Sequence, residues 1–431
     1  MHLRKLCWPH PKTYDFRELI VIMTKNRVEI CLMSTITNEE LSYYNKKFSE
    51  FEKKYNIKII FTRVSWNKAF SWLIESFKNN KAPDIIQLGT TWARTLAYLG
   101  YLDPVPSLVI REPLVGWLKE CCYLDDKWFA VPWFVDIRAL LVHEKILNRV
   151  GISSKNIEST KDFYSVCEKL AKKRSKDKKF PLPFAFPVRP DSEILHRFMS
   201  WFWALGFDFP SLKPVPAKIL SNQIFKKSFK YVSRLIRISN IPRSEVQKHP
   251  YVLFREFSDD HRYIFYQCNW ELRLGENNGY DSELNYDVIP MPHSSSGGKY
   301  WGGGSVLAVS SFTRHRELAW RLVNFITSDD FIGPWIKTNG NLPAFECEFW
   351  KKFMHISSVK SGYKQIKNSV AYPAHPMWAT VEKILSTGLS NFFWKIVDNP
   401  ELNVDDRKVK KELLNADNSV INLLNLNWGR E

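Results

Sequence analysis

Residues 82–92 have the sequence APDIIQLGTTW. A Pro–Asp pair introduces the short apolar run 85–88, which is typical of a buried strand bounded by turn residues. A helical pattern then covers 91–99 and is closed by Gly100. The segment therefore predicts a strand that leads directly into a helix, with Trp92 at the start of the helix.

The same alternation precedes this segment. Residues 28–33 and 57–61 are short apolar runs that predict strands. The helix predicted between them begins with a Thr–Glu capping pair and continues with apolar residues at helical spacing. A further helix is predicted over 66–78. Such alternation indicates a parallel sheet covered by helices, and ligands bind at the carboxyl ends of its strands. The junction 89–92 therefore lies at the edge where a site is expected.

The pattern changes downstream. Residues 129–141 (FAVPWFVDIRALL) contain two strand-like pieces, and a long, mainly helical region is predicted from there to about Trp270. Strand patterns return at 286–292 and 305–310, and they bracket a polar, Gly-rich loop at 294–304. The remainder of the chain is rich in helical patterns. With 431 residues, the chain exceeds the ~250–300 residues that one core supports, so two or three lobes are expected.

The charge balance raises the question of a polyanionic partner. Lys and Arg number 62 against 45 Asp and Glu, a formal net charge of +17. Such a balance suits nucleic acid or an anionic membrane surface. The densest basic run, 169–179, has the pattern of a solvated helix end and loop. No zinc-finger spacing or RNA-binding aromatic signature accompanies it, so nucleic-acid binding is not expected.

Cysteine usage and the N-terminus limit the other classes. The seven Cys are an odd number without a C-x-x-C pair, which argues against a disulfide framework or a zinc site. The first 27 residues lack the apolar stretch of ~7–15 residues that a secretory signal needs. No metal, no cofactor and no signal peptide are therefore predicted.

Several of these segments resemble one family. The matching segments, in chain order, are 56–59, 82–92, 131–138, 286–292 with the glycines 302–304, and 339–344. Together they resemble the carbohydrate-binding ABC-transporter extracellular solute-binding proteins (family 1, maltose-binding-protein-like). The resemblance covers roughly residues 28 to 400.

The resemblance implies an α/β, two-lobed periplasmic-binding-protein fold (type II-like), with an interlobe ligand cleft and three crossovers. Residues 1–27 would be an N-terminal extension. Lobe 1 would comprise 28–138 and 286–332, and lobe 2 would comprise 139–285 and 333–431. This topology explains why strand patterns return after the long helical stretch.

A sugar site needs flat aromatic faces for C–H patches and polar groups for hydroxyls. We expect Asp136 to accept sugar hydroxyls and Arg138 to orient it, with a structural ion pair as the alternative. Gly303 and Gly304 would let backbone N–H groups approach the ligand, or would form a tight crossover turn. The remaining candidates lie at the strand edge, beside the hinge or at positions where the family places aromatic residues, and they are Thr91, Trp92, Trp133, Trp270 and Trp378. A structural core role is the alternative for Trp92, Trp133 and Trp378.

The resemblance implies a solute-binding component of an ABC-type carbohydrate importer that captures a mono- or oligosaccharide by hinge closure. Its expected partners are the sugar and the membrane permease subunits, and a monomer is expected. No catalytic residue is predicted, because a glycosidase needs two facing carboxyls and only Asp136 stands out. Extracytoplasmic placement follows from the family, while the missing signal leaves a cytoplasmic or sensory sugar-binding module as the alternative.

Overall fold

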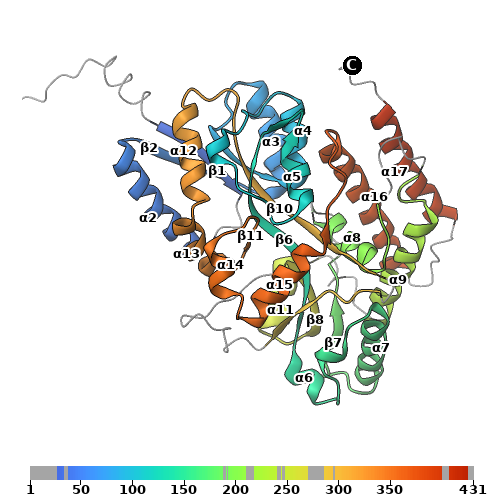
Figure 1. Ribbon diagram of the computed structural model, residues 1–431. Helices are drawn as coiled ribbons and strands as arrows, with labels where there is room; N and C mark the ends of the chain where they lie inside the picture. The colour runs from blue at the N-terminus through green and yellow to red at the C-terminus, as the bar shows by residue number, and fades with distance from the viewer. Residues whose placement is uncertain are drawn as a thin grey trace, which may run out of the picture.

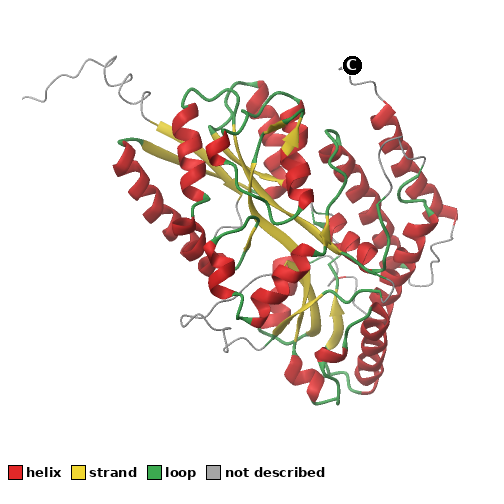
Figure 2. Cartoon of the chain, in the orientation of Figure 1, coloured by secondary structure: helices red, strands yellow, loops and turns green. Residues whose placement is uncertain are grey.

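The computed structural model describes residues 27–33, 37–187, 191, 193–209, 218–239, 244, 248–269, 286–294, 297–399 and 407–425. Trp270 and residues 1–26 lie outside this part of the chain. Strands run through the middle of the molecule and helices cover them on both sides (Figure 2). None of the described helices is both long and apolar enough to cross a membrane.

The first lobe is built on the predicted parallel strands. β1 (Arg27–Met33) pairs in parallel with β2 (Lys58–Val64) and with β3 (Ile85–Gly89). β10 (Tyr300–Val309) joins β3 in antiparallel direction. The helices that alternate with these strands are α2 (Asn38–Tyr55), α3 (Trp66–Lys78) and α4 (Thr90–Tyr98). The strand–helix alternation predicted for 28–99 is therefore confirmed.

One long strand, β6 (Val131–Val142), belongs to both lobes. Its first half pairs with β10, and its second half pairs with β8 (Tyr263–Asn269) and β9 (Asp287–Pro290). β7 (Leu182–Ala185) completes the second lobe's sheet beside β8. Figure 1 shows β6 and β10 passing through the centre of the molecule from one lobe to the other.

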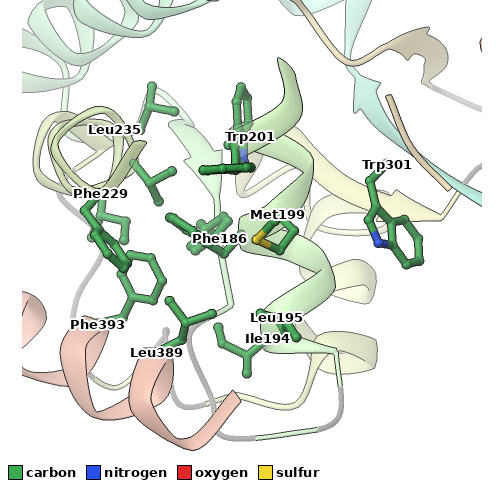
Figure 3. Packing of buried hydrophobic residues seen from close by; sticks show 14 of the residues in the cluster. Phe186, Ile194, Leu195, Met199, Trp201, Phe229, Leu235, Trp301, Leu389 and Phe393 are labelled. Atoms are coloured by element: carbon green, nitrogen blue, oxygen red, sulfur yellow. The ribbon is translucent and has the colours of Figure 1, made fainter. Parts of the chain in front are cut away.

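The second lobe has a large aromatic core under its helices. Figure 3 shows part of this cluster, with Trp301 on one side of α8 and Phe229 and Phe393 on the other. Its helices are α6 (Glu144–Asn148), α7 (Thr160–Lys176), α8 (Ile194–Ala204), α9 (Gln223–Ser239), α11 (Pro250–Ser258), α16 (Trp378–Asp398) and α17 (Arg407–Asn425). Short pieces elsewhere are η1 (Ser107–Val109), η2 (Ser154–Asn156), β4 (Tyr123–Leu124), β5 (Lys127–Trp128), β11 (Leu342–Pro343) and β12 (Ser369–Val370).

The segment 333–366, which the sequence predicts for lobe 2, packs with the first lobe. Trp335 donates its indole N–H to the buried Glu40 carboxylate of α2 at 3.1 Å. Asn339 donates to the same oxygen at 3.1 Å. The helices of this segment and its neighbours are α5 (Gly116–Cys122), α12 (Arg316–Ile326), α13 (Asp329–Asn339), α14 (Glu348–Phe353) and α15 (Ser357–Lys367). We therefore propose that the third crossover lies at 368–377, between α15 and α16.

Two expectations about secondary structure are wrong. β7 and β8 lie inside the region predicted to be mainly helical, because strands buried on both faces lack the alternation that distinguishes them from buried helices. The expected Gly-rich loop at 294–304 also runs into β10, which begins at Tyr300. Gly304 has φ +143°, and a Cβ there would lie 2.2 Å from the Phe134 carbonyl oxygen. The glycine is therefore required for the close approach of β10 to β6.

Candidate functional site

A cavity lies where the two lobes meet, at the carboxyl end of β3. It is a small, partly open pocket whose enclosed volume of about 10 Å³ is room for about one water molecule. The lining comes from the start of α4, the end of α5, β10, the segment after β12 and the start of α16. The lining residues are Thr90, Thr91, Arg94, Cys121, Gly302, Ala371, Tyr372, Pro373, Ala374, His375 and Trp378.

The start of α4 presents one face to this cavity. Thr90, Thr91 and Arg94 lie on that face because residues three and four apart share one side of a helix. Gly89 is the N-cap and provides no side-chain hydrogen bond to the first turn. The first backbone N–H groups of a helix have no partner within the helix, so this end carries a partial positive charge.

Trp92, predicted to stack on a ligand, packs on another side of α4. Its ring lies 5.4 Å from that of Trp66 and 5.4 Å from that of Phe70, and it is 8% exposed. It belongs to a buried apolar cluster and does not line the cavity. The structure therefore places Trp92 in its alternative role, as part of the first lobe's core.

An aromatic pair forms the opposite wall. The ring of Tyr372 stacks on that of Trp378 at 4.8 Å, with 24° between the planes. The Tyr372 hydroxyl also lies 2.8 Å from the Nδ1 atom of His196, within hydrogen-bonding distance. Burial, reinforced by the nearby Glu382 carboxylate, raises the pKa of Tyr372 well above its ordinary value. The phenol therefore stays neutral at physiological pH.

Arg138 is buried at the hinge and holds a carboxylate of the second lobe. Its guanidinium donates to Glu193 and to the Asn269 side chain, and it lies 4.8 Å over the Trp301 ring. His196 stacks on the same indole at 4.8 Å. Burial alone would lower the pKa of Arg138, but the charge and hydrogen bond of Glu193, together with Asp136 and Tyr372, outweigh it and raise the pKa. Arg138 therefore takes part in a structural ion pair.

The other predicted residues occupy separate places. Asp136 is half-buried on β6, opposite Gly303 of β10, and it is not among the cavity-lining residues. Trp133 is 1% exposed and stacks on Trp335 at 4.7 Å, inside the first lobe's core. A Cβ at Gly303 would lie 2.6 Å from the Trp301 ring, so this glycine serves packing between protein groups. Trp270 lies outside the described residues.

The cavity is lined by Thr91 and Trp378, which the sequence analysis named as candidates, and by residues that it did not name. Arg94 follows Thr91 by three positions, so helical spacing alone could have placed both on one face. Tyr372 and His375 precede Trp378 in the segment YPAHPMW, where two prolines and two aromatic residues mark an irregular, aromatic turn. No pattern in the sequence indicates that this turn faces the start of α4.

Comparisons with known proteins address the family and the fold. A family model described as "Bacterial extracellular solute-binding protein" matches residues 46–347. The diacetylchitobiose-binding protein DasA of Streptomyces coelicolor is 24% identical over 342 residues, which cover 77% of each chain.

Solved structures with low identity share the fold. A solute-binding protein of Thermotoga lettingae, solved with α-D-tagatose, has a TM-score of 0.75 at 19% identity and covers 93% of this chain and 100% of its own. Maltose-bound MalE3 of T. maritima has a TM-score of 0.75 at 16% identity, covering 92% and 99%. Lmo0181 of Listeria monocytogenes, solved with cycloalternan, has a TM-score of 0.72 at 14% identity, covering 93% and 99%. The predicted two-lobed α/β fold is thereby confirmed.

Proposed function

Because this chain belongs to the bacterial extracellular solute-binding protein family, we propose that it captures a carbohydrate between its lobes and delivers it to an ABC permease. The observation that supports this most is the cavity itself, which combines a stacked Tyr–Trp pair with hydroxyl, guanidinium and imidazole side chains. A sugar needs this combination, since its faces carry C–H groups and its edge carries hydroxyls.

Hinge closure supplies the mechanism. The α4 side of the cavity belongs to the first lobe and the α16 side to the second, while β6 and β10 connect the lobes. A ligand that contacts both walls binds the closed arrangement more tightly than the open one. Binding therefore shifts the population toward the closed form, which the permease would recognise.

We propose that the protein binds the sugar and releases it without cleaving it. Hydrolysis of a glycosidic bond needs two carboxyl groups across the substrate, and among the described residues the cavity lining contains no Asp or Glu. We further propose a monomer that acts outside the cytoplasm, in keeping with the family's description. A sensory module that binds the same sugar is the rival, and it would need no permease.

Thermal unfolding of the full chain in the presence of single sugars tests this proposal. Tagatose, maltose, diacetylchitobiose and their acidic derivatives form the first panel. A ligand at one hundred times its Kd adds about 2.7 kcal/mol to the free energy of unfolding and so raises the Tm. Chromatography of the sugar afterwards should return it unchanged.

A blocking variant locates the site. Ala374→Trp fills the cavity from the segment after β12, whereas Leu108→Trp adds the same side chain at a 91% exposed position of the first lobe. We expect the Tm increase to vanish in the first variant and to persist in the second. A folded protein whose Tm responds to no sugar, or a sugar that is cleaved, would contradict the proposal.

A further inference from the structure

We propose that the captured carbohydrate is anionic, with a carboxylate or phosphate group held near the start of α4. This inference rests on the proposed function and names its ligand class. The first argument is the charge of the lining, since Arg94 contributes a positive charge and none of the described lining residues is acidic. Glu382, one turn after Trp378 on α16, instead lies 3.4 Å from His196 in the hinge.

The second argument is a pair of buried donors without acceptors. Trp378 is 1% exposed, and its indole Nε1 has no hydrogen-bond partner within the described residues. The Nε atom of Arg94 is likewise buried and without a partner there. Both side chains only donate, and a buried donor without an acceptor is costly. Both residues line the cavity, so a ligand rich in acceptor oxygens that enters when the lobes open would be able to satisfy these donors.

The geometry of Arg94 keeps its guanidinium in place. One of its terminal nitrogens donates to the backbone oxygens of Glu120 and Tyr123, at 3.0 and 3.1 Å. These two carbonyls anchor the side chain at the end of α5 before any ligand arrives. A guanidinium that is positioned in advance loses little conformational freedom when it pairs with an anion.

The third argument is the direction of α4. Its N-terminus lies at the cavity, because Thr90 and Thr91 are its first two residues and both line the space. No side chain of Gly89 caps this end, so an anion there receives backbone N–H groups and the positive end of the helix dipole. Arg94 lies one turn further along the same face and adds its charge.

A neutral sugar fits this lining less well. Sugar hydroxyls donate as well as accept, so a neutral ligand brings further donors to a lining that already holds the unpartnered Nε of Arg94 and Nε1 of Trp378. Carboxylate side chains would balance them, and the described lining provides none. The two unpartnered donors, the charge of Arg94 and the lack of acidic residues in the described lining therefore favour a ligand with negatively charged oxygens.

Calorimetric titration of the full chain with matched sugars tests the inference. D-galactose, D-galacturonate and D-galactose 6-phosphate share one ring and differ at one carbon, and galactobiose and digalacturonate extend the comparison to disaccharides. We expect an acidic member to bind at least about tenfold more tightly than its neutral counterpart, with an affinity that falls as salt rises. Preference for the uronates over the phosphate, or the reverse, identifies the anionic group.

The outcomes separate the two proposals. If a neutral sugar binds as tightly as its acidic counterpart, the anionic inference is overturned while the proposed function stands. If no sugar of any charge binds to a folded sample, both fail.

Variants then assign the residues. Arg94→Gln should weaken binding of the acidic sugar about tenfold or more and change binding of the neutral sugar less than about twofold. Arg321→Gln removes the same charge from the exposed surface of α12, where Arg321 pairs with Glu317, and should leave both affinities unchanged. Equal losses for both sugars would mean that Arg94 only supports α5, which would contradict the inference.

A second variant covers the case in which Arg94→Gln does not fold. Trp378→Phe deletes the Nε1 donor and keeps an aromatic ring against Tyr372. The acidic sugar should again lose more affinity than the neutral one. A variant that binds the acidic sugar as tightly as the unmodified chain would show that this donor does not serve the anion.

Discussion

Glu193 shows how charges are arranged beside the hinge. Burial opposes the ionised carboxylate, but the charges of Arg138, His196 and Arg197 outweigh it and hold the pKa of Glu193 at about 2. The folded pKa therefore lies below the ordinary value of 4.5. A carboxylate of this kind stabilises the fold above its unfolded pKa, and the stabilisation is lost as pH falls through the folded pKa.

Glu193→Gln should remove this stabilisation. Because 41% of the Glu193 side chain is exposed, solvent screening reduces the benefit, and we expect a loss of about 1 kcal/mol near neutral pH. The difference between the two proteins should shrink as pH falls from about 4.5 toward 2. Urea unfolding across this range measures it, with Glu75→Gln on the exposed face of α3 as the control. A difference that is constant with pH would show that the charge of Glu193 does not contribute.

Asp417 fastens the last described helix to the second lobe. Its buried carboxylate accepts the backbone N–H groups of Ile219, Leu220 and Ser221 at 2.7–2.9 Å, and the Ser221 hydroxyl at 2.5 Å. Asp417→Asn replaces one acceptor by a donor that faces donors, so we expect a loss of about 2–3 kcal/mol in the free energy of unfolding. Asn418→Ala, at the exposed neighbouring position, should change it by less than about 0.5 kcal/mol. Equal denaturation midpoints for Asp417→Asn and the unmodified chain would show that these hydrogen bonds do not stabilise the fold.

The candidate site was predictable from single residues only in part. Thr91 was a candidate because it lies at the junction of a predicted strand and helix, and Trp378 because its position resembles that of a stacking aromatic residue in the family. Both residues line the cavity. Trp92 does not line the cavity, because adjacent helical residues point about 100° apart, so the junction that places Thr91 at the cavity places Trp92 in the core. The sequence could not indicate which face of the sheet Trp133 would lie on, because β6 is mostly apolar on both faces.

At the scale of elements, the alternating strands and helices of 28–99 followed directly from periodicity. The strands of the second lobe did not, because β8 is an almost continuous buried run without a turn pattern that separates it from a helix. The glycines of β10 led to the opposite error, because they predicted a loop where the structure has a strand. Three successive glycines are typical of a loop, but here Gly304 allows β10 to approach β6 closely, and Gly302 and Gly303 leave room for the rings of Trp117 and Trp301. These contacts depend on distant partners and not on local sequence.

Gly304→Ala tests that close approach. The positive φ of Gly304 and the contact of a Cβ with the Phe134 carbonyl both oppose a side chain, and together should cost about 3 kcal/mol or more. Gly333→Ala is the matched control, because a Cβ inside α13 meets nothing within 4 Å. That variant should stabilise the protein by about 0.5–1 kcal/mol through helix propensity. Chemical denaturation measures the free energy of unfolding of both variants. Similar changes for the two substitutions would show that Gly304 is not needed for the close approach of β10 to β6.

At the scale of the whole molecule, the sequence predicted two lobes and a division of the chain between them, and the contacts of 333–366 lead us to propose a different division. The segment from α13 to α15 joins the first lobe through contacts that span almost 300 residues, such as the bond from Trp335 to Glu40. Burial, partly offset by the hydrogen bonds from Asn339, Tyr44 and Trp335, raises the pKa of Glu40. A polar contact of this kind has no local pattern, so only the folded chain reveals it.

The shared strands lead to a prediction about unfolding. β6 pairs with β10 and the two-residue β11 through its first half and with β8 and β9 through its second, so it has a neighbour on each side in both lobes. Unfolding either lobe releases β6 and thereby removes an interior strand from the other sheet. We therefore expect calorimetry to show one transition whose calorimetric and van't Hoff enthalpies agree, although chains of this size often unfold in steps. Gly304→Ala should move that single transition as a whole. Two transitions, of which the variant shifts only one, would mean that the lobes unfold independently despite the strands that they share.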